Sequence, residues 1–442
     1  RARTGDAPGA REDLEVVLAA EVASDVAMRA RDELGFALAG AADYRAAVPH
    51  LEAALEAAEV LHDVSEQVTA LSRPSIVHAN RLDFDAALEY GERAERAALA
   101  SGDERFQATA MDALKQVALE TGDIDTLEEL VKRLTEIHRR NDDLWPLQFA
   151  VFEAGYADLE RMRLDRAFAA FDEALAINRR IGDVGNEPLY VATIGRARRG
   201  RGAYEEALAL GRRALDLAVE LGHGEWTAWT GTWLGSTLLE IGELAEATGI
   251  LAAGAEAAER AGADLHLVRC LGLAAWSAQQ LGDGGRAGDL ADRASGILER
   301  VRVRAPRAYV AGQDAYVGVA RVRLAQRRPE VAVALVAPIV DACRACGWSD
   351  GVVDGSLVLA EAAIRGGDAP AAVQAATAAV SEARRTGLPT LWRAHRGVAE
   401  AFRADGDDGA GAEHDAEADR AFAHLLDRLH DRSIRDTFAS AA

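Results

Sequence analysis

Two stretches of the chain decide its fold: GAYEEALALGRRALDLAVELGH, from Gly202 to His223, and LDFDAALEYGERAERAALASGD, from Leu82 to Asp103. Each has a tight turn, then a helical pattern, then a closing glycine. If the alanine near the start of each pattern is taken as an anchor, the pattern returns every 40 residues, at Ala47, Ala87, Leu127, Ala167, Ala207, Ala247 and Ala287. After one step of 45 residues it continues at Ala332, Ala372 and Ala412. A fixed period of this length predicts a chain built from repeated supersecondary units.

Other positions follow the same period. In the first nine units, small residues stand twelve places before the anchor in every unit but one, which has Lys115: Gly35, Ser75, Gly155, Gly195, Gly235, Ala275, Ala320 and Ala360. Glycine recurs fifteen places after it, at Gly102, Gly182, Gly222, Gly262, Gly347 and Gly387. Acidic residues precede the anchor at Asp43, Asp83, Asp123, Glu243, Asp283 and Asp368. Acidic residues favour helix starts and glycine favours helix ends, so each unit is predicted to be a helix, a tight turn and a second helix.

The motifs GAYEEA, at Gly202–Ala207, and DFDAA, at Asp83–Ala87, resemble the tetratricopeptide repeat. The small residue twelve before the anchor matches the small position of that family's first helix, and the anchor matches the alanine of its second helix. The resemblance implies an all-α fold, a right-handed α-solenoid of about ten stacked hairpins. A period of 40 exceeds the usual 34 and is similar to the longer-helix variety found in bacterial signalling proteins. HEAT or armadillo repeats fit the period as well, but the small-residue positions favour the tetratricopeptide type.

The repeat pattern also suggests domain boundaries. We expect residues 1–22 to be a partial hairpin that continues an upstream repeat, 23–424 to be the repeats, with a five-residue insertion near 301–306, and 425–442 to be a C-terminal capping helix or tail. The opening at Arg1 suggests a fragment of a longer protein or a processed product. The ending LLDRLHDRSIRDTFASAA is similar to the tail of long actinobacterial regulators, in which an NTPase or nucleotide-cyclase module precedes such repeats.

Composition limits the classes of function. The net charge of −22 disfavours binding to nucleic-acid phosphates, although a local basic groove would override it. No apolar run reaches the roughly 20 residues that a membrane span needs, and no signal peptide opens the chain. Three cysteines in 442 residues suit a reducing compartment, so we expect a cytoplasmic protein.

We find no motif for catalysis, and we predict no enzyme activity, no cofactor and no metal site. The chain has no phosphate-binding loop, no metalloprotease motif and no nucleophile elbow. Cys343 and Cys346 form one C-x-x-C pair, which cannot supply four zinc ligands, so we interpret them as residues near a helix end. The 10 histidines are scattered.

Aromatic residues cluster in the middle of the chain. In tetratricopeptide arrays the first helices line the concave face, at positions about 18, 15, 11 and 8 residues before our anchor. The residues that we predict to line this groove are Trp145, Phe149, Phe152, Tyr156, Arg196, Arg199, Trp229, Arg269, Trp276 and Arg321. The centre of the groove is then aromatic and locally basic. The alternative is that the aromatic stripes, including Trp226 and Trp233, are packing between repeats.

Two hypotheses of function follow. The first is a non-catalytic scaffold that binds a peptide or protein segment in the concave groove, as the regulatory region of a larger signalling protein. Aromatic and arginine side chains are typical of such binding hot spots. The second is a sensor of a small anionic ligand, which arginines bind well, controlling an attached NTPase, cyclase or transcription-regulator module.

Overall fold

The computed structural model describes residues 7–301 and 309–441, and within these ranges it contains helices and no strand. Ten antiparallel hairpins follow one another, as predicted. Their first helices are α2 (Ser24–Gly40), α4 (Val64–Asn80), α6 (Glu104–Thr121), α8 (Leu144–Glu160), α10 (Glu187–Gly200), α12 (Gly224–Ile241), α14 (Asp264–Gln280), α16 (Gln313–Ala325), α18 (Ser349–Gly366) and α20 (Leu391–Ala404).

The second helix of each hairpin carries the anchor. These helices are α3 (Tyr44–Leu61), α5 (Phe84–Ser101), α7 (Ile124–Arg140), α9 (Leu164–Ile181), α11 (Tyr204–Glu220), α13 (Leu244–Ala261), α15 (Gly284–Leu298), α17 (Pro329–Cys346), α19 (Ala369–Thr386) and α21 (Asp408–Leu426). Three further elements are α1 (Ala7–Ala19), the short 3-10 helix η2 (Val310–Gly312) and α22 (Arg432–Ser440). None of the described helices combines the length and the apolarity that crossing a membrane requires.

The recurring acids and glycines begin and end the helices as predicted. Asp43 is the N-cap of α3, where its carboxylate accepts a hydrogen bond from the Ala46 backbone N–H. The same cap forms at Asp83, Asp123, Asp283 and Asp368. Glu243 occupies the N-cap position of α13, but its side chain makes no capping hydrogen bond. All six predicted closing glycines have φ between +66° and +81°, the left-handed region that glycine enters at no steric cost.

The small residues let the two helices of a hairpin approach closely. A Cβ on Gly35 would lie 2.5 Å from a Leu51 side-chain carbon, and one on Gly235 would lie 2.6 Å from Leu251. The glycine sits on the first helix and the leucine sixteen residues later on the second. Lys115, the exception among the small residues, is also buried, because its ammonium pairs with Glu153 at 2.6 Å and with Asp112 at 2.7 Å.

Two details of the repeat differ from the prediction or lie outside the structure. We predicted Ala412 as the anchor of the tenth unit, but Ala412 is exposed and Gly411 is buried in its place. The N-cap of α21 is Asp407, four residues before Gly411, so the last step is one residue shorter than 40. The predicted insertion near 301–306 falls almost wholly outside the described residues, which resume at Tyr309.

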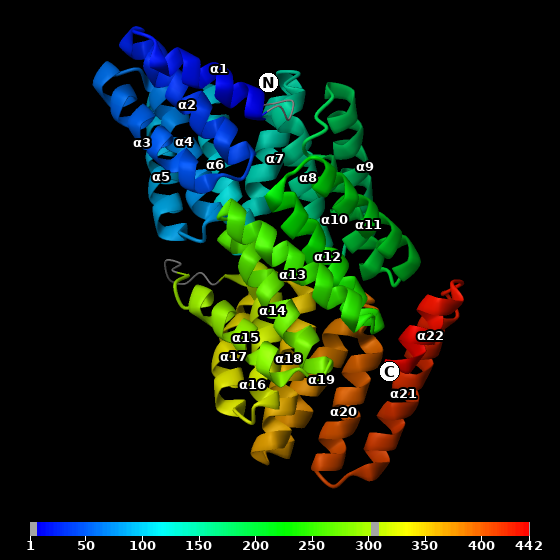
Figure 1. Ribbon diagram of the computed structural model, residues 1–442. Helices are drawn as coiled ribbons and strands as arrows, with labels where there is room; N and C mark the ends of the chain where they lie inside the picture. Colours follow the sequence, from blue (N-terminus) through cyan, green and yellow to red (C-terminus); the bar gives the residue numbers. More distant parts are fainter. Residues whose placement is uncertain (1–6, 302–308, 442) are drawn as a thin grey trace.

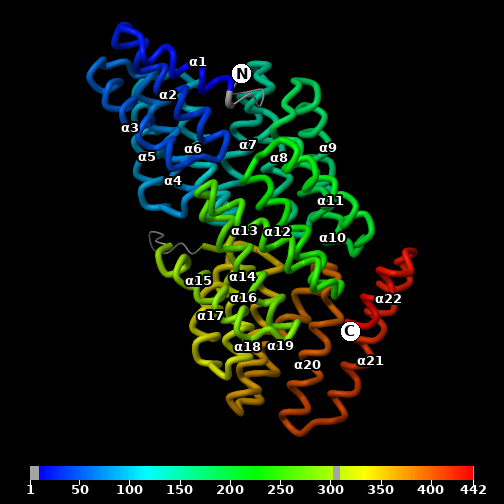
Figure 2. Tube along the Cα trace, in the orientation of Figure 1, coloured from blue at the N-terminus to red at the C-terminus, as the bar shows by residue number. Residues whose placement is uncertain are grey.

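The stack coils so tightly that hairpins four or five units apart touch. The Tyr44 hydroxyl, in the first hairpin, donates to Glu225 Oε2, in the sixth, at 2.7 Å. Arg199, in the fifth, donates to Asp350 Oδ2, in the ninth, at 3.2 Å. Figure 1 and Figure 2 show the result: α14–α21 lie against the end of the coil formed by α1–α11, with α12 and α13 passing between them. The first helices of several hairpins therefore face one another across the interior of the coil.

The C-terminal helix also packs across the coil. Phe438 of α22 is fully buried, and its ring centroid lies 5.3 Å from that of Tyr204 on α11. The Asp431 backbone N–H donates to Glu205 at 2.5 Å, and the Thr437 hydroxyl donates to Glu243 at 3.0 Å. The last helix thus joins the tenth hairpin to the fifth and sixth.

Candidate functional site

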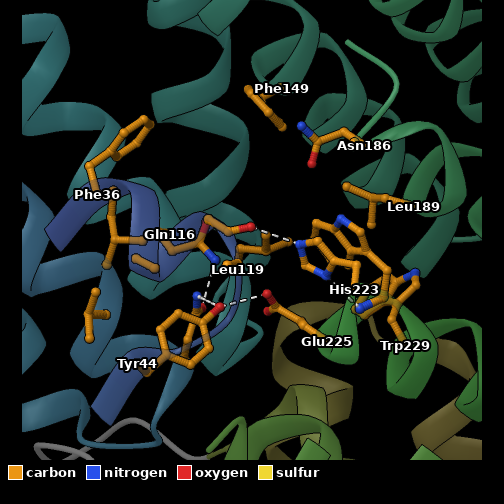
Figure 3. Close-up of a pocket in the computed structure, with 18 of the residues that line it drawn as sticks. Phe36, Tyr44, Gln116, Leu119, Phe149, Asn186, Leu189, His223, Glu225 and Trp229 are labelled. Atoms are coloured by element: carbon orange, nitrogen blue, oxygen red, sulfur yellow. Dashed lines mark hydrogen bonds between the residues drawn. The ribbon is translucent and has the colours of Figure 1, made fainter. Parts of the chain in front are cut away.

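A cavity of about 380 Å³, the first cavity, occupies the interior of the first six hairpins. Its lining comes mainly from the first helices α2, α4, α6, α8, α10 and α12, because these helices face the axis of the coil. In Figure 3, Phe149, Asn186 and Leu189 lie on one side of the cavity, and Tyr44, Gln116 and Glu225 lie on the other.

One wall of the first cavity is aromatic. Trp145 and Phe149, on successive turns of α8, have ring centroids 5.2 Å apart in an edge-to-face arrangement. Phe36 of α2 meets Trp145 at 6.1 Å, so the wall crosses from the first hairpin to the fourth. Trp226 and Trp229 of α12 continue it on the far side. Trp145, Phe149 and Trp226 are only partly buried, so part of each ring is exposed to the cavity.

The opposite wall is a hydrogen-bonded chain of polar side chains, which we call the polar wall. Gln116 Nε2 donates to Glu120 at 2.8 Å and to Asn80 Oδ1 at 3.1 Å. Asn80 Nδ2 donates to the Tyr44 hydroxyl at 2.8 Å, and that hydroxyl donates to Glu225 at 2.7 Å. The chain thus begins and ends on a carboxyl group.

The two terminal carboxyl groups of the polar wall have different environments. Burial, followed by repulsion from Glu225, raises the pKa of Glu120 from its usual value to about 8. Burial acts on Glu225 in the same direction, but hydrogen bonds and charge from His266 outweigh it and leave the pKa of Glu225 below its usual value. His266 Nε2 lies 3.2 Å from Glu225 Oε1. Near neutral pH, Glu225 is therefore ionised while Glu120 retains its proton in a large fraction of molecules.

A buried layer, the central partition, separates the first cavity from a second one. Arg196 of α10 donates two hydrogen bonds to the carboxylate of Glu160 of α8, and the bond from Nη2 is 2.7 Å long. The Arg196 side chain is 3% exposed and the Glu160 side chain is 1% exposed. Arg269 of α14 binds Asp314 through three hydrogen bonds of 2.8–3.1 Å. Both guanidinium groups stack on Trp233, at 4.0 Å and 4.3 Å from the ring centroid.

The second cavity, of about 310 Å³, lies between α12, α14, α16, α18 and α20. Arg199 and Arg321 line it, each opposite a carboxylate of α18: Asp350 at 3.2 Å and Asp354 at 3.1 Å. The guanidinium of Arg321 also stacks over Trp276, 5.2 Å from the ring centroid. Arg199 and Arg321 are therefore each paired with a carboxylate, whereas Arg393, which also lines this cavity, donates to the Glu240 backbone carbonyl at 2.7 Å.

The ten predicted groove residues thus fall in three places. The residues that line the first cavity are Trp145, Phe149, Phe152, Tyr156 and Trp229; those that line the second are Arg199, Trp276 and Arg321. Arg196 and Arg269 line neither, because each is paired with a carboxylate in the central partition. The expected basic character is wrong for this reason: the carboxylates neutralise the arginines.

The polar wall was missed by sequence reasoning, although a signal for it exists. Seven residues before the anchor, five of the second to seventh units carry a polar residue, and the fifth unit has Gly200: the polar residues are Asn80, Glu120, Glu160, Glu240 and Gln280. On the position that holds Phe149 and Trp229, the eighth and ninth units carry Asp314 and Asp354. Polar residues that recur at a position facing the interior indicate either a site or the partners of buried arginines.

The chain's sequence matches no protein-family profile and no curated protein. Its structure is similar to that of a Rap protein complexed with competence and sporulation factor, with a TM-score of 0.57, 11% identity, and coverage of 83% of this chain and 100% of that one. It is also similar to the Rap conjugation gene regulator of the plasmid pLS20 in complex with a Phr peptide, with a TM-score of 0.52, 13% identity, and coverage of 81% and 98%. The fold is that of the tetratricopeptide-like helical repeat proteins.

Proposed function

We propose that this chain is a non-catalytic scaffold that binds a peptide or an extended protein segment in the first cavity. The observation that carries the proposal is the enclosed aromatic wall, to which α2, α8 and α12 contribute partly exposed rings. Ligand pockets of about 300–1,000 Å³ with apolar walls and a few convergent polar groups are the usual form of a binding site. The first cavity has this form, and its volume fits a few side chains of a peptide.

The structural neighbours support a peptide rather than another ligand. The two similar structures were solved with competence and sporulation factor and with a Phr peptide, respectively. The anionic small molecule of our second hypothesis is less favoured, because Arg196, Arg199, Arg269 and Arg321 all have carboxylate partners. An anion would have to displace those carboxylates.

The thiol groups support binding rather than catalysis. Burial raises the pKa of Cys270 to about 11, and it also raises the pKa of Cys346 to about 11. A thiol nucleophile needs a lowered pKa, since the thiolate is the reactive form. Neither of these cysteines is prepared for nucleophilic attack.

A regulatory role follows from the closed coil. A ligand in the first cavity touches hairpins one to six at once, so binding biases the coil toward one curvature.

A synthetic peptide pool tests the proposal. Immobilised protein is incubated with random heptapeptides, retained peptides are identified by mass spectrometry, and the affinity of the most enriched one is measured by calorimetry. Phe149→Ala removes one ring of the Trp145–Phe149 pair. Binding should weaken at least about tenfold, the usual effect of truncating one hot-spot residue. Leu99→Ala is the matched control, because Leu99 is 61% exposed on α5 and lines neither cavity. No enrichment, or equal affinity of the Phe149→Ala variant, would refute the proposal.

A further inference from the structure

We propose that the first cavity holds its ligand by a positively charged group, an ammonium or a guanidinium, which the carboxyl group of Glu120 binds from the polar wall. This inference rests on the proposed function and names the chemistry of the ligand. The cationic group comes either from a peptide N-terminus or from a basic side chain, and the experiment below separates these sources.

The first reason for this inference is that Glu120 is buried without a cationic partner. Its side chain is buried, and the hydrogen-bond donor that it receives from is the neutral amide of Gln116. Within the described residues, no lysine, arginine or histidine lies at ion-pair distance from this carboxyl group. A buried carboxyl without a cationic partner is costly, and a ligand cation is what would offset that cost.

The nearby cations are the second reason, because each is already paired elsewhere. Lys115 binds Asp112 and Glu153, and Arg269 binds Asp314. Arg73, which lines the first cavity, binds Asp32 at 2.5 Å and Glu33 at 2.7 Å. None of them can serve Glu120 without leaving a carboxylate unpaired.

His223, which also lines the cavity, is held in its neutral form. Its Nδ1 accepts a hydrogen bond from the Trp226 backbone N–H, and its Nε2 therefore carries the proton that is donated to the Gly40 carbonyl at 2.9 Å. Burial lowers the pKa of this imidazole further. His223 thus adds no fixed positive charge on this side of the cavity.

The aromatic wall is the third reason. Ring faces attract cations, and Phe149 and Trp226 present partly exposed rings to the same cavity as the polar wall. The indole N–H of Trp229, a side chain that is 7% exposed, has no hydrogen-bond acceptor among the described residues. A peptide carbonyl next to the bound cation would supply that acceptor.

Binding a cation should also release a proton. The cation favours ionised Glu120, whose pKa is about 8 in the empty cavity, so the proton leaves on binding at pH 7. The other titratable or charged groups around it are Glu225 on α12, His223 just before α12, His266 and Arg269 on α14, Glu153 and Tyr156 on α8, Asp183 after α9, Arg73 on α4 and Tyr44 on α3. Because a proton competes with the cation for the Glu120 carboxylate, affinity should fall as the pH is lowered.

Four heptapeptide pools test the inference. The N-terminus is either free or acetylated, and Lys, Arg and His are either present or absent. Pools that carry a cation should be retained, and the acetylated pool without basic residues should not; the two pools with a single kind of cation identify its source. For the best peptide, Glu120→Gln should lower affinity at least about tenfold and abolish the proton release seen by calorimetry in buffers of different ionisation enthalpy.

The controls keep the two proposals distinct. Glu120→Gln retains the shape and the hydrogen-bond acceptor of a side chain that is largely uncharged in the empty cavity at pH 7, so it should fold, and circular dichroism checks this. Glu136→Gln, on the exposed face of α7, should bind like the unmodified protein. Equal retention of the acetylated pool without basic residues, or unchanged affinity of Glu120→Gln, overturns the cation inference while peptide binding stands. Retention of none of the four pools overturns peptide binding itself.

Discussion

Replacing Arg196 with Met should destabilise the protein by about 3–5 kcal/mol, the cost of removing one partner of a buried ion pair. Arg196 and Glu160 are almost wholly buried, and two hydrogen bonds join them. Met has a similar reach but no charge, so the variant leaves the Glu160 carboxylate without its cation. The stacking of the guanidinium on Trp233, at 4.0 Å, is lost as well, and it contributes about 1–2 kcal/mol when desolvated.

Urea unfolding followed by circular dichroism measures this effect, and a second substitution identifies its cause. In Arg196→Met/Glu160→Leu the carboxylate is also gone, so stability should return to within about 1.5 kcal/mol of the unmodified protein. Arg199→Met is the milder control, because the Arg199 and Asp350 side chains are 17% and 21% exposed, and we expect a loss of about 1 kcal/mol.

The pH dependence supplies an independent check. Burial already raises the pKa of Glu160, and Arg196 opposes that rise. Without Arg196 the pKa rises further, so the folded variant takes up a proton more readily and its loss of stability shrinks as the pH falls. The reasoning is refuted if Arg196→Met costs less than about 1 kcal/mol, or if the double variant is as unstable as the single one.

Three further substitutions test other parts of the structure. Phe438→Ala should cost about 3–5 kcal/mol in thermal unfolding, because the ring is fully buried against Tyr204, and no loss would mean that α22 does not pack there in solution. Gly235→Val should cost about 1–3 kcal/mol, because its Cβ would lie 2.6 Å from Leu251, and Leu251→Ala in the same chain should recover part of that loss. Glu120→Gln should reduce the pH dependence of stability. The folded pKa of Glu120, about 8, exceeds the usual 4.5, so this group lowers the stability of the unmodified protein by up to about 1.4 kcal/mol per pH unit as the pH rises between these values. Urea unfolding at pH 5.5 and 7.5 should show a smaller slope in the variant, and the slope that remains comes from Glu153 and Asp32, whose pKa values burial also raises.

The sequence predicted the hairpins well, because each hairpin is determined by local contacts. Asp43 caps its own helix, and Gly35 meets Leu51 sixteen residues away. Such signals repeat with the period and reinforce one another. The tenth unit went wrong by one residue, since Ala412 and Gly411 are both small and the period alone could not choose between them.

The site was predicted only in part, because its form depends on contacts between distant hairpins. The aromatic residues of α8 were correctly placed on the inner face, since helical spacing and the period determine that face. The partners of the arginines were not predicted: Asp314 lies 45 residues from Arg269, and Asp350 lies 151 from Arg199. How tightly the coil winds decides these pairs, and no single repeat encodes that.

The tight winding should also make distant hairpins exchange their amide hydrogens together. In an ordinary solenoid each repeat touches only its neighbours, so a local change spreads along the chain. Here Asp350 of α18 contacts Arg199 and Arg196 of α10 across the coil. Asp350→Ala should therefore accelerate exchange in α10 as well as in α18. Asp354→Ala, on the same helix but paired with Arg321 of the adjacent α16, should accelerate exchange in α16 and α18 and leave α10 unchanged. If both variants leave α10 unchanged, the Asp350 contact across the coil contributes nothing to stability, and the first cavity would then depend on other contacts across the coil, such as Tyr44 with Glu225 and His223 with the Gly40 carbonyl.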